Sequence, residues 1–522
     1  MAATDVSSSA PLPSPPASVP HAGATATTTT DSGFEAVFRA LATRARVFPL
    51  LSAHVATLST PRDFYDQLLH NIRHAERRVS IASLYIGTGP YERAIVEALA
   101  RRLRDRPELQ VHLVLDYARG QRSCGASAAT SVTLLAPLLA AFPRNVELSL
   151  FRVPQLSSLA ATLLSSPLNE TLGVCHAKVY LVDDTLVLSG ANLSADYFTD
   201  RQDRYVQLRH CGELGQFYHD FVEVVKTFAY QVKLEPSSTR GRGRGGTGQG
   251  SSQSDLPYRL VPPELAYDSD EAKGALKQAL EQLVDPAKHV SKTVDPASVV
   301  DTWAIPTLQF TPVAMDHDRQ VVSTLVETLP RGSQLQIASG YLNFPPFLKD
   351  LLVTCEAHLD VISAAPQANG FYNARGVKGA LPMAYSLIEQ DFFEQTLGRN
   401  FPTVLREYNR PGWTFHGKGM WWRPRLRNSH ATGFGLPQLT VVGSSNFGQR
   451  SYGCDLESNL VMFTRNPVLQ RQLQNEYDAL TRDAEVVTEH LWRRPERMLQ
   501  SLFSWKDGYW IRPVSKFIAA YL

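Results

Sequence analysis

The feature that most constrains this chain is a His-x-Lys unit that occurs twice, 240 residues apart. The first copy reads HAKVYLVDDTLVLSGANLS over residues 176–194. The second opens with HGKGMWW at 416–422 and continues with VVGSSNFGQRS at 441–451. In both copies the Lys precedes an apolar segment that leads to small residues and an Asn. Any fold of this chain must therefore place the same local unit at two positions.

The segments before each His-x-Lys unit also match, and they keep the same order. In both copies we predict a strand, a helical run and a second strand, at 78–87, about 91–105 and 109–117, and again at 334–343, about 346–357 and 359–365. Apolar β-rich runs that alternate with helical periodicity are typical of α/β or α+β domains. The sequence therefore predicts an internal duplication: two mixed β-sheet halves flanked by helices, with one active site at their interface.

Composition divides the chain into a tail, two halves and a linker. Residues 1–33 are rich in Ala, Ser, Thr and Pro and contain no Lys or Arg, which predicts a disordered tail and a candidate targeting region. The next stretch, FEAVFRALATRARVFPLL, either extends a targeting signal or forms the first amphipathic helix. A Gly/Ser-rich linker at 236–256 separates a first half at 34–235 from a second half at 257–522.

Charge and hydropathy narrow the partners that we expect. The formal net charge is +2, which gives no overall positive field for binding nucleic acid. No apolar stretch reaches the ~18 residues that a membrane-spanning helix needs. A protein of this kind can still lie on a bilayer, so we expect peripheral membrane contact and no nucleic-acid partner. No feature of the sequence indicates an oligomeric state.

The two His-x-Lys units suit chemistry at a phosphodiester. Residues i and i+2 of a strand face the same side, so His176 lies beside Lys178 and His416 beside Lys418. If the two halves meet, two imidazoles and two ammonium groups surround one cavity. One imidazole can attack phosphorus and the other can protonate the leaving oxygen, while the lysines stabilise charge on the non-bridging oxygens.

Further polar residues follow each unit at matching positions. Asp203 lies eleven residues after Asn192, and Glu457 lies eleven residues after Asn446, each at the start of an apolar strand. Either carboxylate can hold the remote nitrogen of a histidine. Supporting hydrogen bonds are expected from the polar residues of the turns, namely Asn192, Ser444, Ser445 and Asn446. No carboxylate cluster with metal-ligand spacing accompanies them, so we expect no metal and no other cofactor.

These residues resemble the signature of the phospholipase D superfamily, H-x-K-x4-D followed by G-S-x-N. The first copy supplies its His, Lys, Asp, Gly and Asn as His176, Lys178, Asp183, Gly190 and Asn192. The second copy supplies His416, Lys418 and the run GSSN at 443–446, but Arg423 stands where the Asp is expected. The resemblance implies a phospholipase D-like fold and counts Asp183 among the catalytic residues. The departure at Arg423 indicates a structural role for that position.

A narrower resemblance covers residues from about 75 to 515. The blocks SLYIGTGPYE, LDYARG, AAPQANGFYNARGVKGALPMAY, WTFHGKGMWW and FGQRSYGCDLESNL are similar to the eukaryotic phosphatidylglycerophosphate synthase family. The implied reaction converts CDP-diacylglycerol and sn-glycerol 3-phosphate into phosphatidylglycerophosphate and CMP, in the pathway to cardiolipin. The implied location is the mitochondrion, as a peripheral protein of the inner membrane.

The resemblance also implies roles for individual residues. His176 attacks the phosphatidyl phosphorus, and His416 protonates CMP and later activates the acceptor hydroxyl; the reverse assignment is the alternative. Lys178 and Lys418 hold the phosphoryl oxygens. Two aspartates, Asp183 and Asp203, support the first half, and Glu457 orients His416.

Three basic residues are candidates for binding substrate phosphates: Arg119, Arg375 and Lys378. Alternative functions are a phosphatidylserine or cardiolipin synthase, or another phospholipase D-type phosphodiesterase. A non-catalytic membrane scaffold is disfavoured, because both His-x-Lys units are intact.

Overall fold

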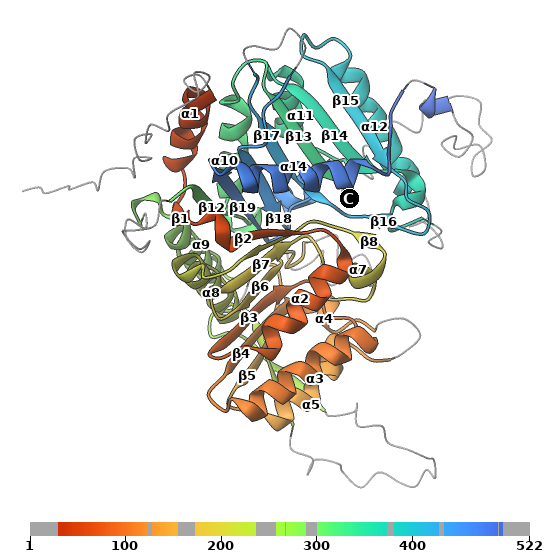
Figure 1. Cartoon of the computed structure of the whole chain (residues 1–522). Coiled ribbons are helices and arrows are strands. Elements are labelled where there is room, and N and C mark those ends of the chain that lie inside the picture. The colour runs from red at the N-terminus through yellow and green to blue at the C-terminus, as the bar shows by residue number, and fades with distance from the viewer. Residues whose placement is uncertain are drawn as a thin grey trace, which may run out of the picture.

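A computed structural model describes residues 30–123, 128–154, 173–235, 257–266, 268–288, 300–372, 381–426, 433–488 and 490–493. The expected linker at 236–256 and most of the expected tail lie outside the described residues, as do Arg375 and Lys378. Within the described part, the chain forms two large mixed sheets, one above the other in Figure 1.

The first sheet has nine strands in the order β11-β10-β5-β4-β3-β6-β7-β9-β2. Its strands are β2 (Val55–Leu58), β3 (Arg78–Ser83), β4 (Gln110–Asp116), β5 (Val146–Phe151), β6 (Val179–Val182), β7 (Thr185–Ser189), β9 (Tyr205–Leu208), β10 (Tyr230–Leu234) and β11 (Tyr258–Val261).

The second sheet also has nine strands, in the order β1-β12-β19-β18-β17-β13-β14-β15-β20. Its strands are β1 (Phe48–Leu50), β12 (Thr302–Gln309), β13 (Gln334–Ser339), β14 (His358–Ala364), β15 (Thr403–Tyr408), β17 (Lys418–Arg423), β18 (Leu439–Gly443), β19 (Glu457–Thr464) and β20 (Ala484–Val486).

The two sheets repeat one topology. In the first, β3 is parallel to β4 and antiparallel to β6, and β6 continues antiparallel to β7. In the second, β13 is parallel to β14 and antiparallel to β17, and β17 continues antiparallel to β18. The predicted strands at 78–87 and 334–343 are the central strands β3 and β13. The duplicated α/β fold expected from the sequence is therefore confirmed.

Helices cover the outer face of each sheet and fill the space between the halves (Figure 1). The larger ones are α1 (Thr30–Ala42), α2 (Pro61–Arg73), α3 (Pro90–Asp105), α5 (Ser131–Ala141), α8 (Gly212–Thr227), α9 (Asp270–Val284), α10 (His317–Glu327), α11 (Pro346–Thr354), α12 (Leu381–Thr396) and α14 (Pro467–Thr481). Short helices are α4 (Tyr117–Gly120), α7 (Asp196–Thr199) and α13 (Gln449–Gly453). The local sequence favours these starts: α2 begins with a capping box between Thr60 and Asp63 and has Pro61 in its first turn.

The first described segment of the chain packs on the second sheet. Phe34 and Phe38 of α1 contact Trp303, and β1 pairs antiparallel with β12. The stretch that begins at residue 34 therefore forms the helix that was one of its two expected structures, and it crosses to the other half of the molecule. The first sheet begins with β2.

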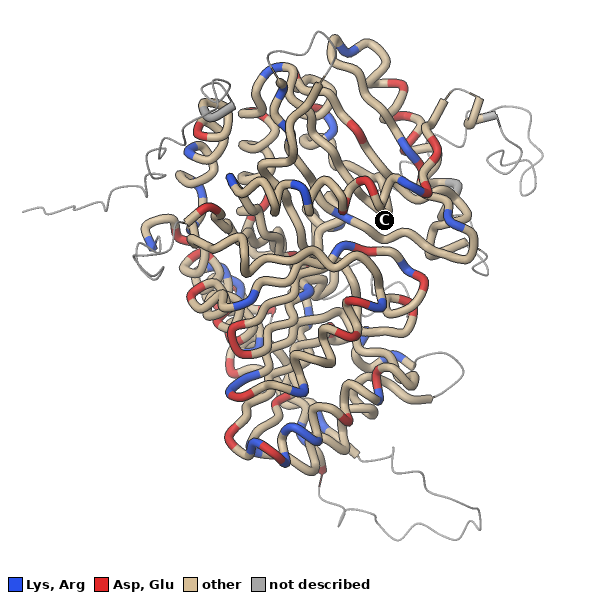
Figure 2. Tube along the Cα trace, in the orientation of Figure 1, with Lys and Arg blue, Asp and Glu red and all other residues tan. Residues whose placement is uncertain are grey.

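The distribution of charged residues over the structure matches the small formal net charge of the sequence (Figure 2). Lys and Arg are interspersed with Asp and Glu over both halves in Figure 2. Among the described residues, no helix combines the length and apolar character that crossing a bilayer requires.

Candidate active site

Two short backbone pairings join the halves next to the His-x-Lys units. Strand β16 (Thr414–Phe415) pairs in parallel with β8 (Arg201–Gln202), and Phe415 lies opposite Gln202. An isolated parallel bridge joins Cys175 to Leu456. Each pairing therefore sets the residue before a histidine opposite the residue before a carboxylate. As a result, each histidine faces a carboxylate of the other half.

The histidine and carboxylate side chains of opposite halves also contact each other. His176 Nδ1 lies 2.9 Å and 3.0 Å from the two carboxylate oxygens of Glu457. His416 Nδ1 lies 2.6 Å from Asp203 Oδ2. Both carboxylates are fully buried, and a buried acceptor at Nδ1 leaves Nε2 of the same ring directed elsewhere. The prediction that Asp203 and Glu457 orient the histidines is consistent with these contacts, but the predicted partners are wrong.

The expected pairing of Glu457 with His416, and of Asp203 with the first half, fails for a physical reason. Sequence spacing places each carboxylate one strand after the turn of its own half. The parallel bridges between the halves then carry the start of that strand across to the opposite histidine. This register depends on how two folded halves dock, which spacing within one half does not specify.

Asp183 does not reach the site, so its expected catalytic role is wrong. It follows β6 at the end opposite His176, in a left-handed conformation with φ of 52°. Its carboxylate accepts backbone N–H groups of Glu76, Arg77 and Arg78 at 2.8–3.1 Å. Asp183 therefore fixes the turn after β6 to the start of β3. In the second half, the guanidinium of Arg423 donates instead to the carbonyl of Gly435.

The two lysines lie beside their histidines, although both histidines precede strands β6 and β17 instead of lying within them as expected. Lys178 Nζ donates to the carbonyl of His176 at 2.6 Å, and Lys418 Nζ donates to the carbonyl of His416 at 2.9 Å. Lys418 Nζ also lies 3.6 Å from Asp203 Oδ2. Both lysine residues are at most 1% exposed, so their charge acts in a poorly screened environment.

Burial controls the protonation of the site. Burial and Lys178 hold the pKa of His176 well below its usual value, and burial with Lys418 lowers the pKa of His416 to about 3. Burial lowers the pKa of Lys178 to about 7, although Glu457 opposes this shift. Near neutral pH the protein therefore holds two uncharged imidazoles, the form that a nucleophile or a general base requires.

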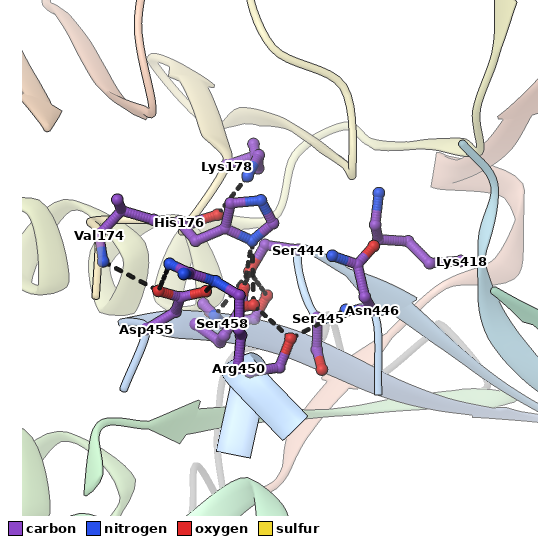
Figure 3. Close-up of polar contacts among 12 residues, drawn as sticks. Val174, His176, Lys178, Lys418, Ser444, Ser445, Asn446, Arg450, Asp455 and Ser458 are labelled. Atoms are coloured by element: carbon purple, nitrogen blue, oxygen red, sulfur yellow. Dashed lines mark hydrogen bonds and ion pairs between the residues drawn. The ribbon is translucent and has the colours of Figure 1, made fainter. Parts of the chain in front are cut away.

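The turn after β18 supports Glu457 (Figure 3). Ser444 Oγ donates to Glu457 Oε2, and Ser451 Oγ donates to Glu457 Oε1 at 2.7 Å. Asn446 lies between His176 and Lys418 in this view, and its Oδ1 is buried without a partner among the described residues. Burial raises the pKa of Glu457, against the attraction of Lys178. Ser444 and Ser451 therefore fix the carboxylate that holds His176.

The first half has no serine at the position of Ser444. There Gly190 leaves room for Lys418 of the other half, because a Cβ on Gly190 would lie 2.4 Å from Lys418 Nζ. Asn192 Nδ2 donates to the hydroxyl of Tyr197 at 3.1 Å. The turn after β18 thus supplies a serine that supports Glu457, whereas the turn after β7 supplies a glycine that leaves room for Lys418.

Aromatic residues that the sequence did not identify as part of the site surround His416. The rings of Tyr197 and Tyr341 meet the imidazole edge-on, with centroids 5.1 Å and 5.8 Å away. The Tyr197 hydroxyl lies 3.5 Å from His416 Nε2, and the guanidinium of Arg201 stacks 4.7 Å from the Tyr197 ring. The repeat does carry a signal for Tyr341, which corresponds to Tyr85 in the matched segments. Tyr197 and Arg201 have no such signal.

Of the three basic candidates for substrate binding, one is described. The guanidinium of Arg119 lies 4.7 Å from the ring of Tyr85, just after β4. The carboxylate of Asp116, at the end of β4 and three residues before Arg119, accepts the N–H of Cys175, which directly precedes His176. This contact keeps the segment that carries Arg119 close to the segment that carries His176. Its role toward substrate stays a prediction.

Comparison with known proteins places this architecture in a class. A crystal structure of phosphatidylserine synthase from Haemophilus influenzae Rd KW20 is similar, with a TM-score of 0.66 and 19% identity, over 94% of this chain and 100% of that chain. The repeated sheets and the paired His-x-Lys units define a protein of phospholipase D-like fold.

Sequence relatives then define the family, although no family model matches the chain. A human protein named CDP-diacylglycerol–glycerol-3-phosphate 3-phosphatidyltransferase, mitochondrial, is 35% identical over 480 residues, which cover 87% of this chain and 82% of that protein. A Saccharomyces cerevisiae protein named for the same transferase is 32% identical over 86% of each chain. The chain belongs to the CDP-diacylglycerol–glycerol-3-phosphate 3-phosphatidyltransferase family and is an enzyme of phospholipid biosynthesis. The expected family and enzyme class are confirmed.

Proposed function

We propose that this enzyme makes phosphatidylglycerophosphate and CMP from CDP-diacylglycerol and sn-glycerol 3-phosphate through a phosphatidyl-histidine intermediate. The observation that carries the proposal is the reciprocal pair of histidine–carboxylate contacts, His176–Glu457 and His416–Asp203, beside two buried lysines. The relatives named for this transferase supply the substrates. In this proposal the product enters the pathway to cardiolipin.

The first step uses His176 as the nucleophile. Glu457 holds Nδ1, so Nε2 attacks the phosphatidyl phosphorus; the N–P bond forms and the P–O bond to CMP breaks. His416 takes up a proton from solvent when the anionic diphosphate binds, and it donates that proton to the departing CMP oxygen. The choice of His176 is supported by its surroundings, because His416 Nε2 lies near the Tyr197 hydroxyl and 3.3 Å from Lys418 Nζ.

The second step transfers the phosphatidyl group to glycerol 3-phosphate. His416, now neutral, accepts the proton of the attacking hydroxyl; the new O–P bond forms and the N–P bond to His176 breaks. The low pKa of His416 favours the neutral base for this step. Lys178 and Lys418 stabilise the non-bridging oxygens in both steps. His416 is buried and the His176 side chain is only 12% exposed, so access of water is limited, which supports transfer over hydrolysis.

The proposed location follows the relatives. The human, mouse and cattle proteins are named mitochondrial, which supports a mitochondrial location for this enzyme. We propose that it acts at the inner membrane as a peripheral protein, because its lipid substrate resides in a bilayer.

The decisive experiment follows a label in the phosphatidyl phosphate of CDP-diacylglycerol. Without acceptor, the wild-type protein and the His416→Ala variant are expected to retain covalent label, and His176→Ala is expected to retain none. Label that is lost in His416→Ala but kept in His176→Ala would refute the assignment of the nucleophile. Absence of label from all three proteins would refute the covalent intermediate.

The acceptor is tested separately through release of CMP. Addition of glycerol 3-phosphate is expected to raise the steady-state release, and addition of serine or phosphatidylglycerol is expected to leave it unchanged. A response to serine would identify a phosphatidylserine synthase, and a response to phosphatidylglycerol would identify a cardiolipin synthase.

A further inference from the structure

A second group of chemically active side chains lies on the first sheet, away from the two catalytic histidines. It consists of His112 on β4 and of His219 and Glu223 on α8, whose ligand atoms all lie within 4.8 Å of one another. His112 precedes Asp116, which contacts the His176 segment, by four residues of one strand, a separation of about 13 Å. We propose that this group binds one divalent transition-metal ion, for which Zn²⁺ is the best fit.

The backbone brings the three ligands to one point. His219 and Glu223 are four residues apart on α8 and therefore share one face of the helix. α8 packs across β3, β4, β5 and β6, and His112 lies on the side of β4 that faces it, since the neighbouring Val114 belongs to the same core as the buried face of α8. A side chain from a strand and two from a helix thus converge across the contact between them.

The donor set suits zinc. Two imidazoles and one carboxylate are a common set for a zinc ion that keeps a fourth position for water. Tetrahedral bonds of about 2.1 Å would separate the ligand atoms by about 3.4 Å, so small rotations of these side chains suffice. The His112 and Glu223 side chains are 16% and 33% exposed, which leaves the group accessible to an ion from solvent.

Neighbouring residues hold the ligands in a suitable arrangement. Ser80, directly opposite His112 on the adjacent strand, lies with its hydroxyl 2.9 Å from His219 Nδ1. If that hydroxyl accepts the Nδ1 proton, Nε2 of His219 carries the lone pair that a metal needs. His112 Nδ1 contacts a carboxylate oxygen of Glu223, and an ion would replace the proton shared between them.

Lys226 does not block the site. Its ammonium contacts Glu223 at 2.6 Å and Glu147 at 2.7 Å. When Glu223 turns to an ion, Glu147 remains as the partner of Lys226. The same contacts without an ion would form a hydrogen-bonded network that fastens α8 to the sheet, so the experiment must separate these two roles.

The test measures zinc bound to the full-length, tag-free protein by equilibrium dialysis and calorimetry. One tightly bound Zn²⁺ per chain is expected in the wild type. His219→Ala and Glu223→Gln are expected to lower the affinity at least tenfold, and Ser80→Ala, which removes only an orienting hydroxyl, about tenfold or more. Co²⁺ in place of zinc should give the visible spectrum of a four-coordinate ion, absent in His219→Ala.

The chain offers a matched control. His70 on α2 and His74, which caps the end of that helix, form another surface pair four residues apart, with ring centroids 4.3 Å apart, and no third ligand adjoins them in the described structure. His70→Ala should leave the zinc affinity unchanged. Zinc that persists in His219→Ala, or that is lost in His70→Ala, would overturn the proposal. So would a wild-type protein that binds no zinc but is destabilised by Glu223→Gln.

Discussion

Glu457 and Asp203 contact different histidines, so substitutions at these positions should affect the chemical steps to different degrees. In Glu457→Gln an amide faces His176 Nδ1 and can donate to it, which leaves the lone pair on the wrong nitrogen for attack. We expect formation of the phosphatidyl-enzyme to slow about 10²–10⁴-fold. Asp203→Asn should slow both the first burst of CMP and the later turnover, because His416 acts in both steps, but its effect on the burst should be smaller than that of Glu457→Gln.

Rapid-quench measurement of CMP release separates the two steps. The matched control is Ser451→Ala, which removes one donor to Glu457 but keeps its charge and should have a smaller effect. A burst that Glu457→Gln preserves and Asp203→Asn abolishes would contradict the assignment of His176 as the nucleophile.

The lowered pKa of Lys178 predicts a pH dependence. The charged ammonium is the form that stabilises phosphoryl oxygens, and its proton is lost as the pH rises through about 7 in the free enzyme. Therefore kcat/KM for CDP-diacylglycerol should fall on the alkaline side of pH 7. The corresponding fall in kcat should occur at higher pH, because bound phosphate stabilises the ammonium.

The control for this profile is Lys178→Arg, whose side chain stays protonated throughout the range. Its residual activity should lack the alkaline fall near pH 7. His176 requires its neutral form and has a lowered pKa, so it should add no acid limb near neutrality. An alkaline fall that persists in Lys178→Arg would assign it to another group.

At the scale of single residues, the sequence identified most of the polar groups of the site but not their partners. His176, Lys178, His416 and Lys418 follow from the repeat because the two members of each His-x-Lys pair are only two residues apart. The contact of Glu457 with His176 of the other half was not predictable, because it depends on how the two folded halves dock. The role of Asp183 was also not predictable. Its spacing from His176 matches the signature, but its carboxylate fixes the turn after β6 to the start of β3.

Between elements, a buried ion pair fastens the segment after β8 to α14. The Arg204 guanidinium forms two hydrogen bonds with Glu476 at 2.8–3.0 Å and stacks 3.8 Å from the ring of Trp421. The side chains of the pair are 0% and 6% exposed. Arg204→Met would leave the buried Glu476 carboxylate without its cation and with only the indole N–H of Trp421 as a donor among the described contacts, so we expect a loss of about 3–5 kcal/mol in the free energy of unfolding.

Chemical denaturation of Arg204→Met, Glu476→Gln and the double variant measures this coupling. The double variant should be less destabilised than the sum of the single variants by about 0.5–3 kcal/mol. Arg62→Met, which disrupts the exposed Arg62–Asp66 pair on α2, should leave the unfolding midpoint unchanged. Additive effects of Arg204 and Glu476 would show that the pair does not act as a unit.

At the scale of elements, the predicted order of strands and helices agrees with the structure because each has its own periodicity. The predicted strand at 109–117 is β4 and the predicted helix near 346–357 is α11. The attachment of α1 and β1 to the second sheet was not predicted. Their apolar residues signal that they are buried, but nothing in the pattern specifies which half buries them.

For the whole molecule, the cross-half contacts predict that the covalent connection at 236–256 is dispensable after folding. Strand β1 pairs with β12, β8 pairs with β16, and Arg204 pairs with Glu476, all between segments on opposite sides of that connection. A protein with an inserted protease site there should, once cut, elute as one particle and keep most of its activity.

Size-exclusion chromatography with an assay of glycerol 3-phosphate-dependent CMP release checks this prediction. Wild-type protein treated with the same protease is the control for cleavage elsewhere. Separation of the fragments with loss of activity would show that the contacts between the halves are too weak to hold the site together.

Each proposed catalytic histidine contacts a carboxylate of the other half, so catalysis requires that the two halves are assembled. When the halves part, His176 is deprived of Glu457 in the same event that deprives His416 of Asp203. Neither ring can be left in working order by itself, so a partly opened molecule has no half-strength activity. Under the proposed mechanism, turnover therefore reports the state in which both contacts between the halves are made.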